Sequence, residues 1–340
     1  MRAPRPGPPP RLRSGGRIAL TGGRGLLGVR LIERLAEVGW TDRLLALDLR
    51  PTSGIPHRQL DLTQPGVDRE LYRLLEGEGI EAVVHLALPS DPGRDRARRQ
   101  RLESQGTLAL LSACSAAGVK HVVMRSYTAL YGAHPDNPEL IDEDQPLRAD
   151  PGLAWASHKI EAEQHAAAFA RRHPEMTVSV LRFAPILGRG VQGFYPRLLE
   201  RQRVLLPAGG DPQLQLLHPD DALDALERCL ERRPPGPLNV APSATVPLRR
   251  ALELCDRPVL DVPAGLLRLS AALAWGVGLG GSPGGFVDYV RYSCVADGRR
   301  ARRVLGFDPR YRSREALASW LAERRGARRQ LSPPRGRPAR

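Results

Sequence analysis

The glycine-rich run at residues 21–28, TGGRGLLG, constrains the fold of this chain more than any other segment. It follows a short apolar run and opens a segment whose leucines have helical spacing. Gly22 permits a tight turn, Gly25 lets the backbone approach a pyrophosphate, and Gly28 lets a helix pack closely on a strand. The first turn of that helix, with Leu26 and Leu27, presents unpaired N–H groups and partial positive charge to phosphate. The run therefore predicts a dinucleotide-binding strand–helix–strand unit.

An acidic residue, Asp48, ends the next apolar run, twenty residues beyond Gly28. A carboxylate at this place accepts hydrogen bonds from the adenosine ribose hydroxyls and repels a 2′-phosphate. The sequence therefore predicts NAD as the cofactor in preference to NADP. Arg24 and Arg50 lie close enough in sequence to weaken that preference. The alternative for Asp48 is an acid that caps a helix or a turn.

Apolar runs of strand length alternate with segments of helical period in the first half of the chain. Such alternation predicts an α/β fold with a doubly wound parallel sheet, the NAD(P)-binding Rossmann fold. We expect an NAD-binding Rossmann domain at 17–183 and a smaller C-terminal substrate-side region at 184–323, interleaved with the Rossmann core. The strand-like runs lie at 17–21, 43–48, 56–61, 81–87, 121–127 and 176–183, and the helical segments at 26–38, 67–78, 96–117 and 155–172.

The formal net charge of +14 comes almost entirely from the two ends of the chain. Residues 1–17 carry five arginines and residues 324–340 carry seven, with no acid in either segment, so the body keeps a charge of about +2. Segments 1–16 and 324–340 are rich in Pro, Gly and Arg, which predicts disordered basic tails. Solvated tails are favoured, and weak contact with nucleic acid or an anionic surface is the alternative.

Cysteine usage and hydropathy also limit the class of protein. The four cysteines are widely spaced and form no C-x-x-C pair, which favours reduced side chains in a cytoplasmic protein over a disulfide frame or a metal site. The longest uncharged stretch, 269–287, contains Pro283 and several glycines and is a poor membrane span. We expect a core helix followed by a loop there, and no transmembrane segment.

Further motifs follow the strand-like runs, at the sheet edge where open α/β folds bind their ligands. Asp61 and Leu62 follow the third run, and Leu86 and Ala87 end the fourth. Together with the glycine motif, these residues resemble the extended short-chain dehydrogenase/reductase family, in its NAD-dependent epimerase/dehydratase group, over about residues 17–323. The resemblance implies that Asp61 and Leu62 contact adenine and that Leu86 and Ala87 lie under the NAD cofactor.

The resemblance fails at the catalytic positions. Family members use Tyr-x-x-x-Lys on a helix, where the tyrosine moves a proton and the lysine binds the cofactor ribose and lowers the tyrosine pKa. Lys159 matches that lysine, but Trp155 stands at the tyrosine position, and its indole cannot act as a general acid or base. Tyr127 occupies the position of the family's catalytic Ser or Thr, and Glu103 that of an asparagine.

Two functions stay open on this pattern. A catalytic protein would act on a hydroxyl or keto group of a small molecule such as a nucleotide sugar, with Tyr127 as a relocated proton donor polarised by Lys159. A non-catalytic protein would bind NAD as a sensor or scaffold, because Trp155 replaces the tyrosine. The resemblance also implies a homodimer through a four-helix interface that includes 96–117 and 155–172.

A cluster of arginines follows the fourth strand-like run. We expect a solvated helix face there, and a site for a phosphorylated substrate is the weaker alternative. The cluster consists of Arg94, Arg96, Arg98, Arg99 and Arg101.

Overall fold

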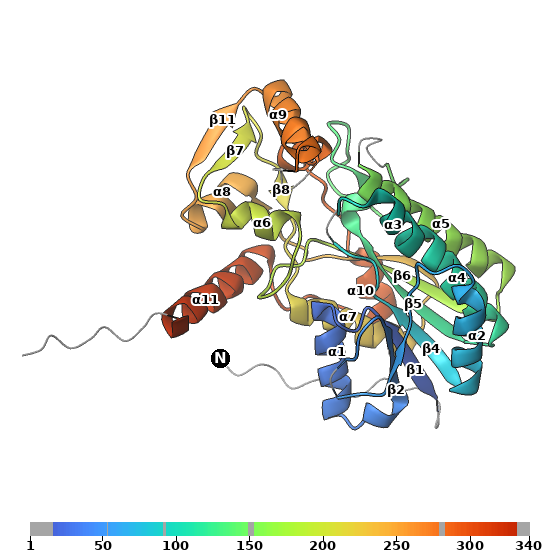
Figure 1. Cartoon of the computed structure of the whole chain (residues 1–340). Helices are drawn as coiled ribbons and strands as arrows, with labels where there is room; N and C mark the ends of the chain where they lie inside the picture. The colour runs from blue at the N-terminus through green and yellow to red at the C-terminus, as the bar shows by residue number, and fades with distance from the viewer. Residues whose placement is uncertain (1–15, 53, 91–92, 149–152, 279–282, 332–340) are drawn as a thin grey trace, which may run out of the picture.

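A seven-stranded parallel sheet forms the centre of the molecule (Figure 1). The computed structural model describes residues 16–52, 54–90, 93–148, 153–278 and 283–331. The strand order is β3-β2-β1-β4-β5-β6-β9, and every neighbouring pair is parallel, which confirms the doubly wound α/β fold. The strands are β1 (Arg17–Thr21), β2 (Leu44–Asp48), β3 (His57–Gln59), β4 (Ile80–His85), β5 (His121–Tyr127), β6 (Thr177–Phe183) and β9 (Gly236–Val240).

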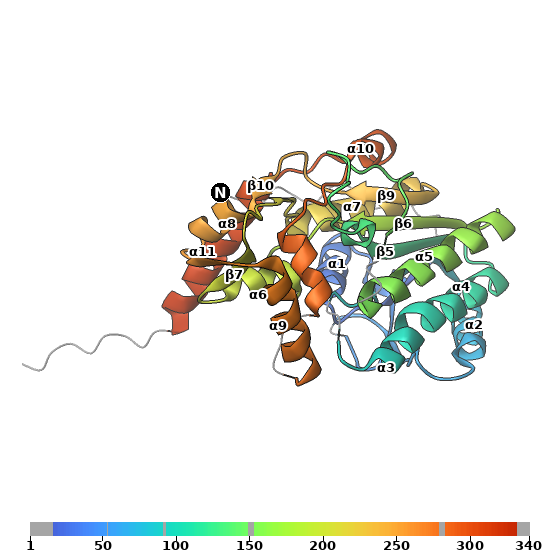
Figure 2. The same cartoon turned by 90° about the horizontal axis from the view of Figure 1, so that it is seen from above.

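Helices cover both faces of the sheet (Figure 2). Side chains alternate along each strand, so Ile18 and Leu20 join the core beneath α1 and α7, whereas Ala19 joins the core beneath α2 and α4. Helix α5 lies beside α4 on that second face, and α10 packs against α7 on the first. These helices are α1 (Leu26–Glu37), α2 (Val67–Gly77), α4 (Gly106–Ala116), α5 (Ala154–Arg172), α7 (Pro219–Arg232) and α10 (Arg299–Leu305).

The segment predicted as one helix at 96–117 consists of three consecutive helical pieces. These are α3 (Arg96–Gln100), a π-helical turn η2 (Arg101–Gln105), and α4. Turns of this kind insert an extra residue into an α-helix and often occur at functional sites. Here the π turn carries Glu103, whose side chain is fully buried.

The chain beyond β6 is divided between the sheet and a smaller lobe. Strand β9 completes the sheet beside β6, and α7 and α10 cover it. The remaining elements enclose a separate apolar core that includes Leu199, Leu206 and Trp320. They are α6 (Phe194–Glu200), β7 (Val204–Pro207), β8 (Gln213–Leu214), β10 (Val246–Pro247), α8 (Leu248–Leu254), β11 (Val259–Val262), α9 (Ala264–Gly276), the 3-10 helix η4 (Gly284–Val290) and α11 (Ser313–Leu331).

The prediction of a core helix within 269–287 is wrong about burial. Helix α9 forms there, but none of its residues is buried. It lies at the edge of the smaller lobe against η4 and β7, which cover only one of its sides. Apolar composition alone does not show whether a helix is enclosed, because enclosure depends on neighbours from elsewhere in the chain. Across the described part of the chain, no helix has both the length and the apolarity to cross a membrane.

Part of the segment predicted as the C-terminal basic tail is helical. Helix α11 continues to Leu331, beyond the expected boundary at 323. Arg324 pairs with Glu200 and lies over the ring of Trp320, 4.7 Å from its centroid, so the helix keeps packing partners past the boundary. Residues 1–15 and 332–340 lie outside the described residues.

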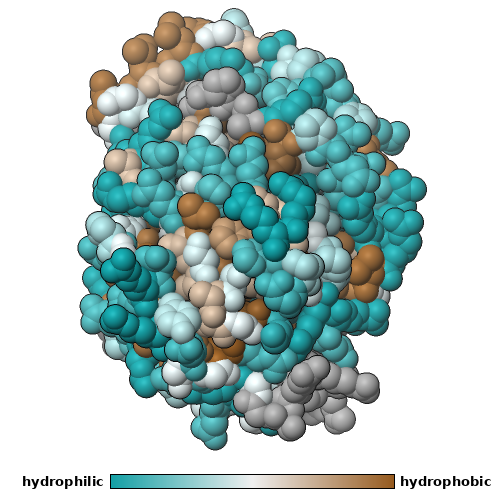
Figure 3. Space-filling view, turned by 90° about the vertical axis from the view of Figure 1, so that its right-hand side faces the viewer, coloured by the Kyte–Doolittle hydropathy of each residue, from teal (hydrophilic) through white to brown (hydrophobic). Residues whose placement is uncertain are grey.

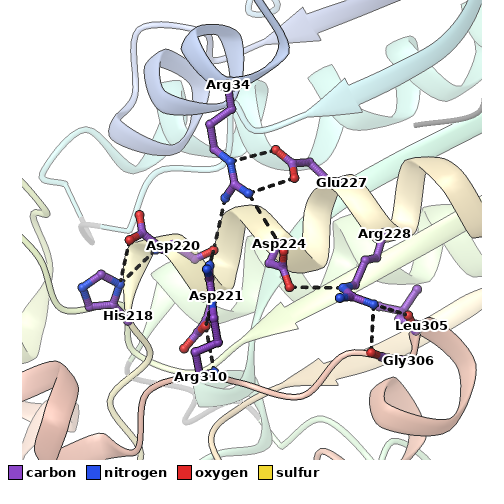
Figure 4. Close-up of polar contacts among 10 residues, drawn as sticks. All are labelled: Arg34, His218, Asp220, Asp221, Asp224, Glu227, Arg228, Leu305, Gly306 and Arg310. Atoms are coloured by element: carbon purple, nitrogen blue, oxygen red, sulfur yellow. Dashed lines mark hydrogen bonds and ion pairs between the residues drawn. The ribbon is translucent and has the colours of Figure 1, made fainter. Parts of the chain in front are cut away.

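A polar network ties α1 and the segment after α10 to α7 (Figure 4). Arg34 of α1 pairs with Glu227 at 2.9 Å. Asp221, whose side chain is buried, accepts backbone hydrogen bonds from Arg310 at 3.0 Å and Tyr311 at 3.1 Å. One carboxylate thus positions the loop that leads from the sheet-covering helices into α11.

We expect Asp221→Asn to lower the free energy of unfolding by about 1–3 kcal/mol. Asparagine has one acceptor oxygen where aspartate has two, so one of the two backbone N–H groups would face an amide nitrogen that cannot accept its hydrogen bond. Urea unfolding followed by circular dichroism measures the change. Asp308→Asn is the matched control, since the Asp308 side chain is 74% exposed and its loss should change stability little. Equal stability of the two variants would contradict this role of Asp221.

Candidate cofactor and substrate site

The glycine turn after β1 is packed too closely for any side chain. Gly22 has a φ of +73°, and a Cβ atom there would lie 2.6 Å from the carbonyl carbon of Leu86 at the end of β4. A Cβ atom on Gly28 would lie 2.5 Å from the carbonyl oxygen of Gly22. The amide of Gly25 donates to the same oxygen at 3.0 Å. The turn, the start of α1 and the end of β4 therefore meet as the motif requires.

A cleft of about 560 Å³ opens beside this turn. The predicted cofactor residues line it, apart from Gly28, which lies beneath the turn, and Lys159. Arg98, Arg99 and Arg125 also line it. The predicted residues at its wall are Gly22, Gly25, Leu26, Leu27, Asp48, Asp61, Leu62, Leu86 and Ala87.

The two acids of the cleft are held by local hydrogen bonds. Asp48 accepts from the amide of Leu49 at 2.8 Å and more weakly from that of Arg24 at 3.4 Å. The guanidinium of Arg24 donates instead to the carbonyl of Pro51 at 2.9 Å. Burial acts to raise the pKa of Asp61, but hydrogen bonds from Thr63 and others outweigh it and lower that pKa. Asp61 is thus a fixed anion at the adenine end predicted for it.

Two arginines of the cluster that was predicted to form a solvated helix face also lie at the wall of the cleft. Arg98 and Arg99 line the cleft, and Arg99 pairs with Glu103 at 3.1 Å. Positive charge at the cleft wall suits a ligand that carries phosphates. Sequence spacing gave no sign of which arginines face the cleft, because that depends on the π turn that follows them.

A second, smaller cavity of about 70 Å³ adjoins the cleft. Its walls are largely aromatic, and it shares Ser90, Arg125, Ile186, Val191 and Gln192 with the cleft. We call it the aromatic pocket. Its ring-bearing residues are Tyr127, Trp155, Phe183, Phe194, Tyr195, Phe286 and Tyr289.

Of the two predicted catalytic residues, Tyr127 lines the aromatic pocket and Lys159 lies buried behind Trp155, and the hydrogen bonds of both lead elsewhere. The Tyr127 hydroxyl donates to the carbonyl oxygen of Leu88, and burial raises the pKa of that phenol. The Lys159 ammonium pairs with Glu103 at 2.7 Å, and both side chains are fully buried. Lys159 therefore does not reach the Tyr127 hydroxyl, the arrangement that a relocated proton donor would need.

Trp155 lies between Lys159 and the pocket. Its ring centroid is 4.7 Å from the Lys159 ammonium and 5.5 Å from the Tyr127 ring. Its indole nitrogen is buried and has no hydrogen-bond partner among the described residues. Burial lowers the pKa of Lys159 to about 8, against the opposing effect of Glu103. The indole thus covers a buried cation and leaves one donor unsatisfied.

Ser126, the residue before Tyr127 on β5, turns away from the pocket, as strand alternation predicts. Ser126 donates to Glu163 on the other side of the strand, and Glu163 pairs with Arg182 at 2.6 Å. Arg125 lies two residues before Tyr127 and shares its face of the strand, with its guanidinium 4.9 Å from the Tyr127 ring. No cluster of three or more His, Cys, Asp or Glu suited to a metal occurs within the described ranges.

A family model described as the NAD dependent epimerase/dehydratase family matches residues 18–241. The match covers the glycine turn, the cleft and the whole sheet. The chain belongs to the NAD-dependent epimerase/dehydratase family.

The similar proteins include one without a stated activity, one named as a reductase and one solved with a nucleotide sugar. An uncharacterised protein of Mycobacterium tuberculosis is 28% identical over 319 residues, which cover 90% of this chain and 84% of that protein. A 3-diazoavenalumate denitrifying reductase of a Streptomyces species is 30% identical over 270 residues, covering 74% of this chain and 85% of the relative. Among solved structures, MoeE5 in complex with UDP-glucuronic acid and NAD is 26% identical with a TM-score of 0.72, covering 92% of this chain and all of MoeE5.

Several pocket residues were not found from the sequence. Phe194 and Phe286 lie far from the recognised motifs, in α6 and η4, and no local pattern marks them. Arg125 could have been found from the sequence, because its spacing of two residues from Tyr127 places both side chains on one face of the strand.

A buried histidine beneath the cleft makes stability depend on pH. His85 contacts Thr21 at 2.6 Å and Thr107 at 3.1 Å, and burial lowers its pKa from 6.5 to about 4. Protonation therefore favours the unfolded chain, and the stability that His85 contributes above pH 6.5 is lost progressively as the pH falls from about 6.5 to about 4. The full contribution is about 3 kcal/mol.

We expect the free energy of unfolding to fall between about pH 6.5 and pH 4, and His85→Asn to flatten that fall. Urea unfolding across this pH range provides the measurement. His173→Asn is the control, because the His173 side chain is 33% exposed. If the His85 variant kept the parental pH slope, the buried histidine would not be its source.

Proposed function

We propose that this protein binds NAD(H) in the cleft and carries out a redox reaction on a small organic molecule in the aromatic pocket. The observation that carries the proposal is the junction of the two cavities, which share Ser90, Arg125 and three further residues. When bound, NAD(H) supplies or accepts a hydride. The NAD bound to MoeE5 supports the choice of cofactor.

The cleft residues have separate roles in holding the cofactor. The turn at Gly22 to Gly28 and the start of α1 receive the pyrophosphate, with Arg98 and Arg99 adding positive charge at the wall. Asp48 accepts hydrogen bonds from ribose hydroxyls and disfavours a 2′-phosphate, so NAD is preferred over NADP. Asp61 and Leu62 contact adenine, and Leu86 and Ala87 form the floor.

The substrate side lacks the proton-transfer pair of the family. Trp155 has no titratable proton, and the Tyr127 hydroxyl is committed to the carbonyl of Leu88. Tyr127 and Lys159 act in proton transfer only if the hydroxyl releases Leu88 and Glu103 releases the ammonium. The site therefore favours a reaction whose hydride step requires no proton from these side chains. Trp155 contributes its aromatic ring to the pocket wall, while its indole nitrogen stays buried.

The name of the Streptomyces relative, a reductase of a diazo compound, supports a reductive reaction. A nucleotide sugar is the second candidate substrate, favoured by the UDP-glucuronic acid bound to MoeE5. The aromatic walls of the pocket here favour an apolar or ring-bearing substrate instead. Titration of the NADH-loaded protein with UDP-glucuronic acid separates the two, since a nucleotide sugar should bind measurably only if it is the substrate class.

A protein that binds NAD without turnover is the remaining alternative. Screening NADH oxidation with small aromatic electrophiles and with nucleotide sugars tests it, using Tyr127→Phe beside the parent. NADH binding without turnover by any of these compounds would favour a sensor or scaffold. We also propose a homodimer through α4 and α5, and a cytoplasmic location in keeping with the four free cysteines.

We expect Gly28→Ala to weaken NADH binding by roughly tenfold or more, because the added methyl group would displace the turn from α1. Gly77→Ala is the matched control, since nothing lies within 4 Å of its added Cβ. Isothermal titration with NADH and NADPH measures both variants and the parent. Preference of the parent for NADPH would contradict the role proposed for Asp48, and unchanged binding by Gly28→Ala would contradict the cleft as the site.

NADH absorbs at the wavelengths where tryptophan emits, so a bound nicotinamide ring should quench Trp155. We expect Trp155→Phe to remove most of the NADH-dependent quenching while changing the affinity by less than about threefold, because Phe keeps the aromatic wall. Fluorescence titration measures both quantities. Trp275→Phe, on α9, should leave the quenching nearly unchanged, and the reverse pattern would place the nicotinamide elsewhere.

A further inference from the structure

An apolar surface covers the outward side of α9 and the strands beside it, and we call it the α9 patch. The four members on or directly after α9 are spaced by three or four residues and share one helix face. Their exposed fractions range from 57% for Leu269 to 71% for Val277. In Figure 3, apolar residues gather at the upper edge of the molecule, the end that carries α9 in Figure 1. The members are Leu205, Leu260, Leu266, Leu269, Leu273 and Val277.

The patch continues from the helix onto a small sheet. Leu205 of β7 and Leu260 of β11 are register partners in this parallel pair, so their exposed side chains lie together. Helix α9 contacts β7 directly. A continuous exposed apolar surface of this kind marks an interaction site more often than a scatter of single residues does.

Helix α9 is firmly held on its inner side. Arg94 donates to the carbonyls of Trp275 at 3.0 Å and Gly278 at 2.8 Å, beyond the last turns of the helix. Arg268, the only charged residue of α9, pairs with Asp288 of η4. The outward face is therefore a fixed apolar surface without a charge of its own.

Positive charge borders the patch. Arg201 lines a groove together with Leu205 and Leu267, between α6 and α9. Arg203 is exposed and lies two residues before Leu205 in the chain. In sequence, residues 1–17 and 324–340 carry twelve further arginines and no acid, which makes the chain as a whole strongly basic. A second copy of this chain would bring like charges together, whereas an anionic surface complements them.

We propose that the α9 patch docks on an anionic lipid surface. The leucines enter the boundary between headgroups and acyl chains, and the arginines contact anionic headgroups. The groove between α6 and α9 shares Phe194 and Phe286 with the aromatic pocket, so docking would turn an apolar path to that pocket toward lipid. The docking itself does not depend on the proposed redox function.

Co-sedimentation of the full chain with vesicles tests the proposal. We expect binding to vesicles of mixed phosphatidylcholine and phosphatidylglycerol, and much weaker binding to phosphatidylcholine alone. Leu269→Glu combined with Leu273→Glu should lower the bound fraction by roughly tenfold or more. Leu140→Glu is the matched control, because Leu140 is 47% exposed and lies outside the patch. Circular dichroism checks that each variant is folded.

Brominated phosphatidylcholine in the mixed vesicles reports which face is in contact with lipid. It should quench the emission of the tryptophan added by Leu273→Trp within the patch, and should quench much less the tryptophan added by Leu140→Trp outside it. Full binding by the double glutamate variant would show that the arginine-rich ends suffice and would overturn the proposal. Equal binding to neutral vesicles, or a dimer that the double variant dissociates in light scattering, would also overturn it.

Discussion

The close approach of the Gly22 turn to the end of β4 is the contact on which the site depends. Because no side chain fits at Gly22 or Gly28, β1, β4 and the first turn of α1 meet without intervening atoms. The parallel order of the sheet then brings the carboxyl ends of β2, β4 and β5 to the same edge. Asp48 and Ala87 therefore lie at that edge and line the cleft, and Tyr127 lies there at the wall of the aromatic pocket.

Glu103, Trp155 and Tyr127 form one packed unit around Lys159. Glu103 supplies the buried carboxylate that a buried ammonium requires, and Trp155 covers the same ammonium with its ring. Tyr127 packs against Trp155 and sends its hydroxyl to the backbone. The ammonium is thereby enclosed, and the pocket wall beside it is aromatic. Replacing a single member would leave a buried charge or a cavity.

Apolar side chains line the substrate side and also the outer surface of the smaller lobe. The aromatic pocket, the groove between α6 and α9, and the α9 patch follow one another, with Phe194 and Phe286 common to the first two. The cofactor side differs, because acids and arginines line its cleft. The molecule thus combines a polar cleft with an aromatic pocket that shares two of its walls with an outer groove.

The sequence by itself determined the parallel sheet, the glycine turn and the family, because these depend on periodicity and on short motifs whose geometry is local. It also placed Asp48 and Asp61 at the sheet edge where the cleft lies, since both follow strand-like runs. Only the tertiary structure decided that Tyr127 bonds to Leu88, that Glu103 meets Lys159 through the π turn, and that Phe286 closes the pocket. It alone also showed that α9 is exposed and that α11 extends past residue 323. Those features depend on contacts between residues far apart in the chain, and no local pattern encodes which of them will meet.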